Sequence, residues 1–287
     1  MAVNKIERKL PADHYIRAGS INTRCWVLGE GETNIILIHG LGASADIWMH
    51  NIHALSRNYR LYVPDLMGFG RSDIPGASFS PTDYIHFLDD FLNALNIERA
   101  VLIGQSLGGG IALQYTIRFP EKVSTLVLVD NAGFGYETIW TLRLMSLPVI
   151  GELMSVPTRV GVRIFFQLAV RNPAVITEQI VDIYYEHFSR PGQQAFMLRL
   201  IRSIINFRGG RREVLASVVE NLRNITQPAL IIWGEHDRVL PLAHAYYGKG
   251  KMPRSELCIF PGCGHIPFFE NPDAFNKAVL DFLQSAS

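Results

Sequence analysis

Cysteine is scarce in this sequence, and neither sign of charge prevails. The chain has 3 cysteines in 287 residues, and 27 Lys and Arg residues against 26 Asp and Glu residues give a net charge of +1. This odd and sparse set, Cys25, Cys258 and Cys263, does not suit the disulfide framework of a small secreted domain. Lys and Arg do not gather in a long block that could bind nucleic-acid phosphates. We therefore expect a reducing compartment and no nucleic-acid partner.

Long apolar runs are missing as well. A membrane-spanning helix needs about 18 or more consecutive apolar residues, and the longest weakly charged stretch, residues 144–170, is interrupted by prolines and arginines. Residues 1–11 do not contain the apolar centre of a secretory signal. From these absences we expect a cytoplasmic protein without stable membrane insertion. They leave the oligomeric state open.

Short apolar runs alternate with helical patterns over most of the chain, and 48% of the residues are apolar, enough for a large buried core. Continuous apolar strands between helices are typical of a parallel sheet that is covered on both faces. The predicted fold class is therefore α/β, with a mostly parallel, doubly wound sheet. The expected strands lie at 14–18, 23–28, 34–38, 59–63, 100–103, 125–129, 229–234 and 256–260, and the expected helices at 46–55, 80–95, 111–119, 241–249 and from 272 onward.

The alternation stops in the middle of the chain. Between residues 133 and 220 no strand can be recognised, and prolines divide the segment into several helical stretches. We therefore predict a core made of residues 1–132 and 221–287, with residues 133–220 as a helical insertion.

Residues 104–108, Gly-Gln-Ser-Leu-Gly, lie between an expected strand and an expected helix. A chain that turns from strand to helix so sharply holds the central serine at positive φ, with its hydroxyl exposed at a helix N-terminus. Gly104 and Gly108 leave room around this bend, and Gly109 lets the helix pack closely. This nucleophile elbow predicts that Ser106 is a nucleophile, although a serine that only caps the helix has the same pattern. A similar string at 68–72 has no helix after it and is expected to be a structural loop.

A serine hydroxyl needs a neutral imidazole to take its proton and a carboxylate to orient that imidazole. His265 and Asp237 follow Ser106, each in a loop just after an expected strand. This chain order, Ser, Asp, His, is the one that doubly wound hydrolases use. Asp130, at the end of the strand after the elbow, is the alternative acid, and we favour Asp237.

Two backbone N–H groups are needed to hold the oxyanion of an acyl-transfer intermediate. The amide of Leu107 directly follows the nucleophile, and the loop after the 34–38 strand should supply the other, with Leu41 as the best candidate. His39 in the same loop is expected to brace it through hydrogen bonds. These are backbone roles, so the apolar side chains of both leucines do not oppose them.

Together these motifs resemble an α/β-hydrolase-fold serine hydrolase of the kind that carries a helical cap. The resemblance covers nearly all of the chain outside the insertion and rests on HGLGAS at 39–44, PDLMGFGRSD at 64–73, GQSLGG at 104–109, WGEHDRVLP at 233–241 and GCGHIPFFENP at 262–272. It implies that residues 133–220 form a cap over the active site. Haloalkane dehalogenases and epoxide hydrolases of this fold carry aspartate where this chain has Ser106, which disfavours both activities.

The cap is expected to supply much of an apolar substrate pocket. The apolar side chains of the cap would serve equally well to pack cap helices on the core, and an arginine on a cap helix is commonly just solvated. The candidates are Gly40, Phe134, Leu144, Met145, Phe165, Phe166, Arg190, Phe196, Met197, Phe207 and Ile266.

The expected function is hydrolysis of carboxylic esters with an apolar acyl or alkyl group, through an acyl-enzyme on Ser106. The resemblance also allows a carbon–carbon bond hydrolase of the meta-cleavage-product type, in which Arg190 would anchor a substrate carboxylate. Such enzymes typically have Asn before the serine and Trp after the histidine, where this chain has Gln105 and Ile266. The fold also includes lyases and receptors that do not hydrolyse their ligands.

Spacings that could suggest a metal are few. His50 and His53 are three residues apart, as are many pairs on a helix, and Cys263 precedes His265 by two residues. Neither pair belongs to a complete zinc ligand set. We predict that the protein has no metal and no cofactor, and that its partner is a small-molecule substrate.

Overall fold

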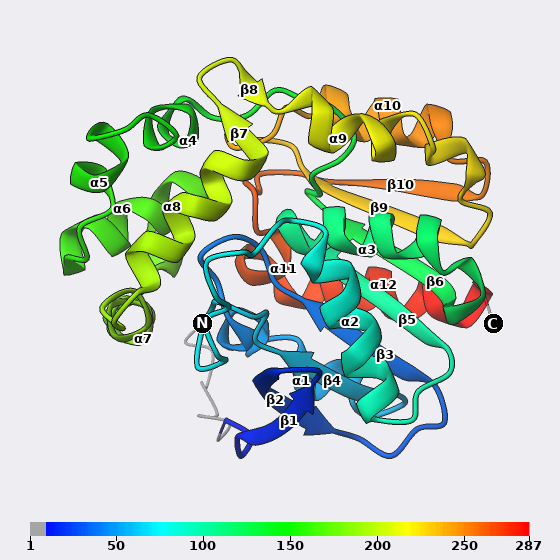
Figure 1. The fold of residues 1–287 in the computed structure, drawn as a ribbon. Coiled ribbons are helices and arrows are strands. Elements are labelled where there is room, and N and C mark those ends of the chain that lie inside the picture. Colours follow the sequence, from blue (N-terminus) through cyan, green and yellow to red (C-terminus); the bar gives the residue numbers. More distant parts are fainter. Residues whose placement is uncertain (1–9, 287) are drawn as a thin grey trace, which may run out of the picture.

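A computed structural model describes residues 10–286 of the chain. Its centre is an eight-stranded sheet with the order β1-β2-β4-β3-β5-β6-β9-β10 (Figure 1). The strands are β1 (His14–Ala18), β2 (Ile21–Leu28), β3 (Asn34–Ile38), β4 (Arg60–Pro64), β5 (Ala100–Gln105), β6 (Val123–Val129), β9 (Ala229–Gly234) and β10 (Ser255–Phe260). Neighbours from β4 to β10 are parallel, while β2 pairs antiparallel with both β1 and β4. The predicted α/β class and mostly parallel sheet are thus confirmed.

Both faces of the sheet are covered because its central strands are apolar on both sides. In β5, Ala100 and Leu102 join one core cluster, whereas Val101 and Ile103 join the other. On the first face pack α2 (Asp83–Ala94), α3 (Leu107–Arg118) and α10 (Ala243–Lys251). On the second face pack α1 (Ile52–Leu55), α11 (Pro267–Glu270) and α12 (Pro272–Ala286). Successive side chains of a strand point to opposite faces, so continuous apolar runs indicate this arrangement.

The helix predicted over residues 46–55 is wrong in one respect, because two short pieces replace it. The first is the 3₁₀ helix η1 (Ala45–Trp48), and the second is α1. Between them, the side chain of Asn51 donates hydrogen bonds to the Phe268 carbonyl and to Asn276 Oδ1, each at 3.0 Å. Asn51 is buried, and these long-range bonds fix the break.

Between β6 and β9 the chain leaves the sheet and forms helices beside the edge where the parallel strands end (Figure 1). A two-stranded ribbon of β7 (Ile205–Asn206) and β8 (Gly209–Gly210), absent from the sequence prediction, interrupts them. The ribbon turn needs Gly209, which has φ of +121°. The helices of this region are α4 (Trp140–Met145), α5 (Ile150–Met154), α6 (Arg159–Ala169), α7 (Glu178–Phe188), α8 (Gln193–Ile204) and α9 (Arg212–Val219). The region also contains the 3₁₀ helix η3 (Pro173–Val175). Two further 3₁₀ helices lie outside it, η2 (Pro120–Lys122) before β6 and η4 (Leu222–Asn224) before β9.

The last of these helices contacts the core. α9 packs on α3, and Val218 belongs to the core cluster of the first face. None of the helices within residues 10–286 combines the length and the apolar character needed to cross a bilayer.

Candidate active site

Ser106 lies at the sharp turn between β5 and α3. Its backbone has φ of 52° and ψ of −115°, a conformation that costs free energy for a residue with a side chain. Its N–H donates to the Val129 carbonyl of β6 at 2.9 Å, which holds the strained turn in place. The serine therefore stands at the carboxyl edge of the sheet, directly before the N-terminus of a helix.

The glycines around Ser106 are needed because backbone approaches them on every side. A Cβ at Gly104 would lie 2.5 Å from the Gly108 carbonyl oxygen, and a Cβ at Gly108 would lie 2.4 Å from the Ile38 oxygen. A Cβ at Gly109 would lie 2.3 Å from the Asn131 Cβ. These close contacts explain the small residues of the elbow and agree with the close helix packing expected from the sequence.

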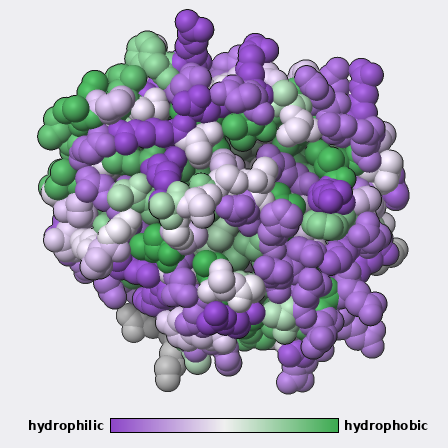
Figure 2. Space-filling model, in the orientation of Figure 1, coloured by the Kyte–Doolittle hydropathy of each residue, from purple (hydrophilic) through white to green (hydrophobic). Residues whose placement is uncertain are grey.

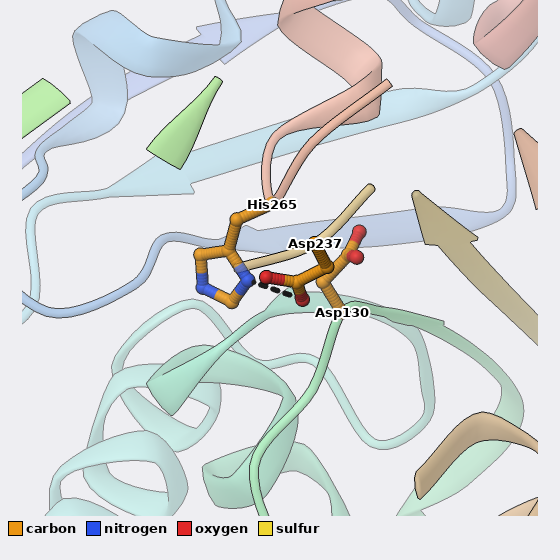
Figure 3. A group of neighbouring side chains, drawn as sticks. All are labelled: Asp130, Asp237 and His265. Atoms are coloured by element: carbon orange, nitrogen blue, oxygen red, sulfur yellow. Dashed lines mark hydrogen bonds and ion pairs between the residues drawn. The ribbon is translucent and has the colours of Figure 1, made fainter. Parts of the chain in front are cut away.

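His265 and Asp237 meet at the same edge. His265 Nδ1 lies 2.8 Å from Asp237 Oδ2, and both side chains are almost fully buried (Figure 3). The other oxygen, Asp237 Oδ1, accepts the N–H groups of Val239 at 2.7 Å and Leu240 at 3.1 Å. The carboxylate is thus fixed by its own loop, and it leaves His265 Nε2 as the ring nitrogen that can exchange a proton with another group.

Asp130, the alternative acid, lies beside Asp237 and makes a different contact (Figure 3). Its Oδ1 accepts the N–H of Gly234 at 2.9 Å, and its Oδ2 has no hydrogen-bond partner among residues 10–286. Complete burial, and then repulsion from Asp237, raise the pKa of Asp130 well above its usual range. Asp130 thus bonds to a backbone amide beside Asp237, whereas the imidazole of His265 bonds to Asp237 itself.

The loop after β3 brings the second expected amide to the site. Leu41 lines the same cavity as Ser106, and Leu107 begins α3, where the first N–H groups of a helix have no partner within it. Gly40 makes the approach possible, since a Cβ there would lie 2.2 Å from Gln105 Oε1 and 3.1 Å from the Ser106 Cβ. Gly40 therefore acts through the absence of a side chain.

His39 braces this loop, as expected. The N–H of Leu66 donates to His39 Nε2 at 2.9 Å, so the ring proton resides on Nδ1 and is donated to the Gly40 carbonyl at 2.8 Å. Burial lowers the pKa of His39 to about 4, which keeps the ring neutral and in this tautomer.

A cavity of about 270 Å³ joins these groups to the helices beside the sheet. Ser106 and His265 line it together, and Gln105 and Thr141 are the other polar side chains of its wall. The remaining wall is apolar, and the described residues that line it include neither Lys nor Arg. Among the predicted pocket residues, the wall contains Met145, Phe165, Phe166 and Ile266.

Comparison with known proteins agrees with this arrangement. The profile of the family described as "Alpha/beta hydrolase family" matches residues 35–278. The chain belongs to the alpha/beta hydrolase family. The predicted resemblance to a serine hydrolase of this fold is therefore confirmed.

Relatives of this hydrolase include both uncharacterised and named proteins. An uncharacterized protein of Mycobacterium tuberculosis is 34% identical over 268 residues, which cover 90% of this chain and 77% of the relative. The 2-hydroxy-6-oxo-2,4-heptadienoate hydrolase of Pseudomonas putida is 31% identical, over 93% of this chain and 95% of that protein. The structure of a meta-cleavage product hydrolase from Pseudomonas fluorescens IP01 is similar with a TM-score of 0.82 and 28% identity, covering 96% and 98% of the two chains.

Several predicted pocket residues of this hydrolase lie elsewhere. Phe134 stacks on Trp233 in the core of the sheet, and Phe196 packs against Phe69. Met197 belongs to a small cluster within the insertion. Arg190 is also absent from the cavity wall, because its guanidinium donates to the carbonyls of Gly70 and Ser72 in the loop after β4. Phe134, Phe196 and Arg190 thus connect the insertion to the core, whereas Met197 packs within the insertion. Leu144 and Phe207, also predicted for the pocket, are likewise not part of the wall.

Two positioning residues of the hydrolase were missed from the sequence. Gln105 Nε2 donates to the His265 carbonyl at 3.1 Å and so ties the elbow to the histidine loop. Glu270 accepts three backbone N–H groups, from Gly264 at 2.6 Å, Arg171 at 2.8 Å and Asn172 at 3.0 Å. Its carboxylate thereby fastens both the histidine loop and the turn after α6. The position of Glu270 five residues after His265 was visible in the sequence, but its partners were not.

Asp130, Asp237 and His265 offer ligand atoms that all lie within 4.8 Å of one another. This donor set is already engaged, since Asp237 bonds to His265 and to two amides, and Asp130 bonds to Gly234. A metal ion would have to displace the hydrogen bond that orients the imidazole. The expected absence of a metal stays a prediction, which activity after EDTA treatment would test.

Proposed function

We propose that this hydrolase cleaves carboxylic esters with apolar acyl or alkyl groups through an acyl-enzyme on Ser106. The observation that carries the proposal is the cavity at Ser106 and His265, whose wall is apolar and contains no cationic side chain among the residues described. A neutral ester loses little by entering such a cavity, whereas a carboxylate would lose its hydration without gaining a charged partner.

In the proposed reaction, Ser106 Oγ attacks the ester carbonyl while His265 Nε2 takes the hydroxyl proton. Asp237 holds the imidazole and stabilises its positive charge. The amides of Leu107 and Leu41 donate hydrogen bonds to the oxyanion of the tetrahedral intermediate. His265 then gives the proton to the departing alcohol, and the same steps with water release the acid and restore Ser106.

We further propose that residues 133–220 act as the cap of this site. Support comes from α5 and α6, which supply Met154, Ile164, Phe165 and Phe166 to the cavity wall. The proposed cap begins at residue 133, between the end of β6 and the start of α4, although Phe134 itself packs in the core. Substrate choice would then depend mainly on these helices.

A carbon–carbon bond hydrolase is the second candidate, and it is favoured by the named relatives that act on dienoates. Against it stands the position of Arg190, which bonds to two carbonyls outside the cavity wall and is not free to anchor a carboxylate there. Gln105 and Ile266 also occupy the positions where the sequence analysis expects Asn and Trp in such enzymes.

The test compares p-nitrophenyl esters of graded acyl length with one meta-cleavage dienoate, with Ser106→Ala as the control for background hydrolysis. We expect kcat/KM to be highest for an ester of medium acyl length. Faster turnover of the dienoate would replace the proposal by the second candidate. Labelling of Ser106 by a fluorophosphonate without turnover of either class would point to a lyase or a receptor.

A further inference from the structure

Large apolar side chains are exposed together on one side of the insertion. Leu153 is 71% exposed, Val160 67% and Trp140 60%. In Figure 2, apolar side chains gather at the upper left, where Figure 1 places α4 and α5. We call this surface the apolar face and define it as Trp140, Leu153, Met154, Val160, Ile164 and Phe207. Exposed apolar side chains are normal singly, but a group of them marks a surface that meets a partner.

The apolar face continues into the catalytic cavity. Met154 and Ile164 are 41% and 50% exposed, yet both also line the cavity that contains Ser106. The outer surface and the inner wall are thus parts of one apolar surface. A partner that covers this face therefore also covers a route to the serine.

Cations border the apolar face. The rings of Trp140 and Phe207 lie 5.7 Å apart, and the Arg143 guanidinium lies over Trp140 at 5.2 Å. Arg208 follows Phe207 and is exposed. Within residues 10–286, neither Arg143 nor Arg208 forms an ion pair with a carboxylate, whereas Glu152 of α5 is paired with Arg202 at 2.8 Å. The uncompensated charge at this border is therefore positive.

We propose that the apolar face docks the protein on a lipid surface with anionic headgroups, where an ester dissolved in the lipid can enter the cavity. Trp, Phe and Leu side chains enter the boundary between headgroups and acyl chains, and arginines beside them bind anionic headgroups. A second copy of the chain fits less well, because a symmetric dimer through this face would add the unpaired arginines of both copies to one interface without supplying carboxylates for them. The lipid ester as substrate rests on the proposed function, but docking does not.

The docking experiment is vesicle flotation of the full chain with phosphatidylcholine vesicles, with and without phosphatidylglycerol. We expect binding that increases with phosphatidylglycerol. The double variant Leu153→Glu, Val160→Glu should reduce the partition coefficient about tenfold or more, because two new carboxylates would have to enter the lipid boundary beside anionic headgroups. Tyr246→Glu is the matched control, since Tyr246 is 58% exposed on α10, outside the apolar face, and it should bind as the wild type does.

A second pair of changes tests the charges. Arg143→Gln with Arg208→Gln should weaken binding to anionic vesicles about tenfold and leave binding to neutral vesicles unchanged. Equal binding of the wild type and the Leu153→Glu, Val160→Glu variant would overturn the proposal. So would a wild-type dimer, seen by sedimentation, that this variant dissociates, because a second copy would then occupy the face.

Activity separates this proposal from the proposed function. Turnover of soluble p-nitrophenyl acetate should be the same in all of these variants, since none of the changed residues lines the cavity. Hydrolysis of a long-chain ester embedded in vesicles should fall with binding. Vesicle binding without hydrolysis of any ester would contradict the proposed function alone, and ester hydrolysis without vesicle binding would contradict docking alone.

Discussion

The two sides of the cavity differ in what their residues contribute. On the sheet side, Ser106 is held by backbone contacts, and Gly40, Gly104 and Gly108 leave no room for a Cβ. On the other side, α5 and α6 contribute mostly apolar side chains to the wall, and neighbouring residues such as Leu153 are mostly exposed. One side has almost no freedom to change without losing its geometry, whereas the other can change its lining while the nucleophile stays in place. The difference teaches that the fold keeps the geometry of the turn at Ser106 separate from the lining of the opposite wall.

The largest effect should come from the sheet side. We expect Ser106→Ala to lower kcat by about 10⁶-fold if it acts in a triad, because members of such a unit lose nearly all of their contribution together. Turnover of the best p-nitrophenyl ester measures this. Circular dichroism should show an unchanged fold, and activity near the wild-type level would refute the nucleophile.

Stability should distinguish the two sides next. Phe134 is 1% exposed and stacks on Trp233, so Phe134→Ala should lower the free energy of unfolding by about 3–5 kcal/mol. Leu153→Ala on α5 should change it by no more than about 0.5 kcal/mol. Urea unfolding at pH 7 compares both with the wild type. Equal losses would mean that Phe134 belongs to the insertion rather than to the core.

Lowering the pH should destabilise both the core and the insertion, because each contains a buried histidine that stays neutral in the folded chain. Burial lowers the pKa of His39, in the loop after β3, and of His187, in α7, to about 4 from the ordinary value of 6.5. Between pH 6.5 and 4, each histidine binds a proton in the unfolded chain but not in the folded chain. Its contribution to the free energy of unfolding is therefore fully present above pH 6.5 and is lost as the pH falls toward 4. From pH 7 to pH 5 each should contribute a loss of about 2 kcal/mol. The negative charges of Asp65 and Asp46 oppose this lowering of the His187 pKa.

The variant His187→Gln tests this loss of stability in the insertion. Neither ring nitrogen of His187 has a hydrogen-bond partner among the residues described. Urea unfolding at pH 7 and pH 5 should show a smaller loss in the variant than in the wild type. An unchanged dependence on pH would show that His187 does not resist protonation in the folded chain.

The smallest effect concerns the residue that joins the two sides. Glu270→Gln keeps the size of the side chain but replaces one acceptor oxygen by an NH₂ group, which would face the N–H groups that Glu270 now binds. We expect kcat to fall about tenfold through displacement of the histidine loop, with KM changed less. Glu235→Gln is the matched control, because Glu235 accepts one backbone N–H, that of Gly262 at 3.1 Å, on the exposed side of the same loop, and otherwise lies 3.6 Å from the ring of His236. Equal effects of both variants would mean that Glu270 has no special positioning role.

Local signals made the sheet side predictable from the sequence. The apolar strands, the glycines around Ser106 and the order of Asp237 and His265 each depend on residues that are near one another in the chain or at strand ends. The elements of the core were therefore predicted within a few residues, with two exceptions. One is the break at Asn51, whose partners lie more than two hundred positions away, and the other is the short helix α11, which was not predicted.

The insertion was less predictable because its helices have apolar residues on more than one side. Periodicity cannot tell whether Phe165 or Phe196 faces the cavity, and only packing shows that Phe165 does. Arg190 and Glu270 were missed or misplaced for another reason, since both bind backbone groups that are distant in the sequence. A side chain that serves a remote carbonyl or amide leaves no pattern near its own position.

The backbone of His265 offers a way to observe the insertion directly. Its N–H donates to the carbonyl of Ala169, the last residue of α6, at 2.6 Å. If α6 lifts from the sheet, this amide is released, and its proton can exchange with deuterium from the solvent. The exchange rate of this amide would then report how often α6 lifts. A foreign insertion grafted here would have to restore this bond, because it holds the histidine loop together with the bonds of Gln105 and Glu270.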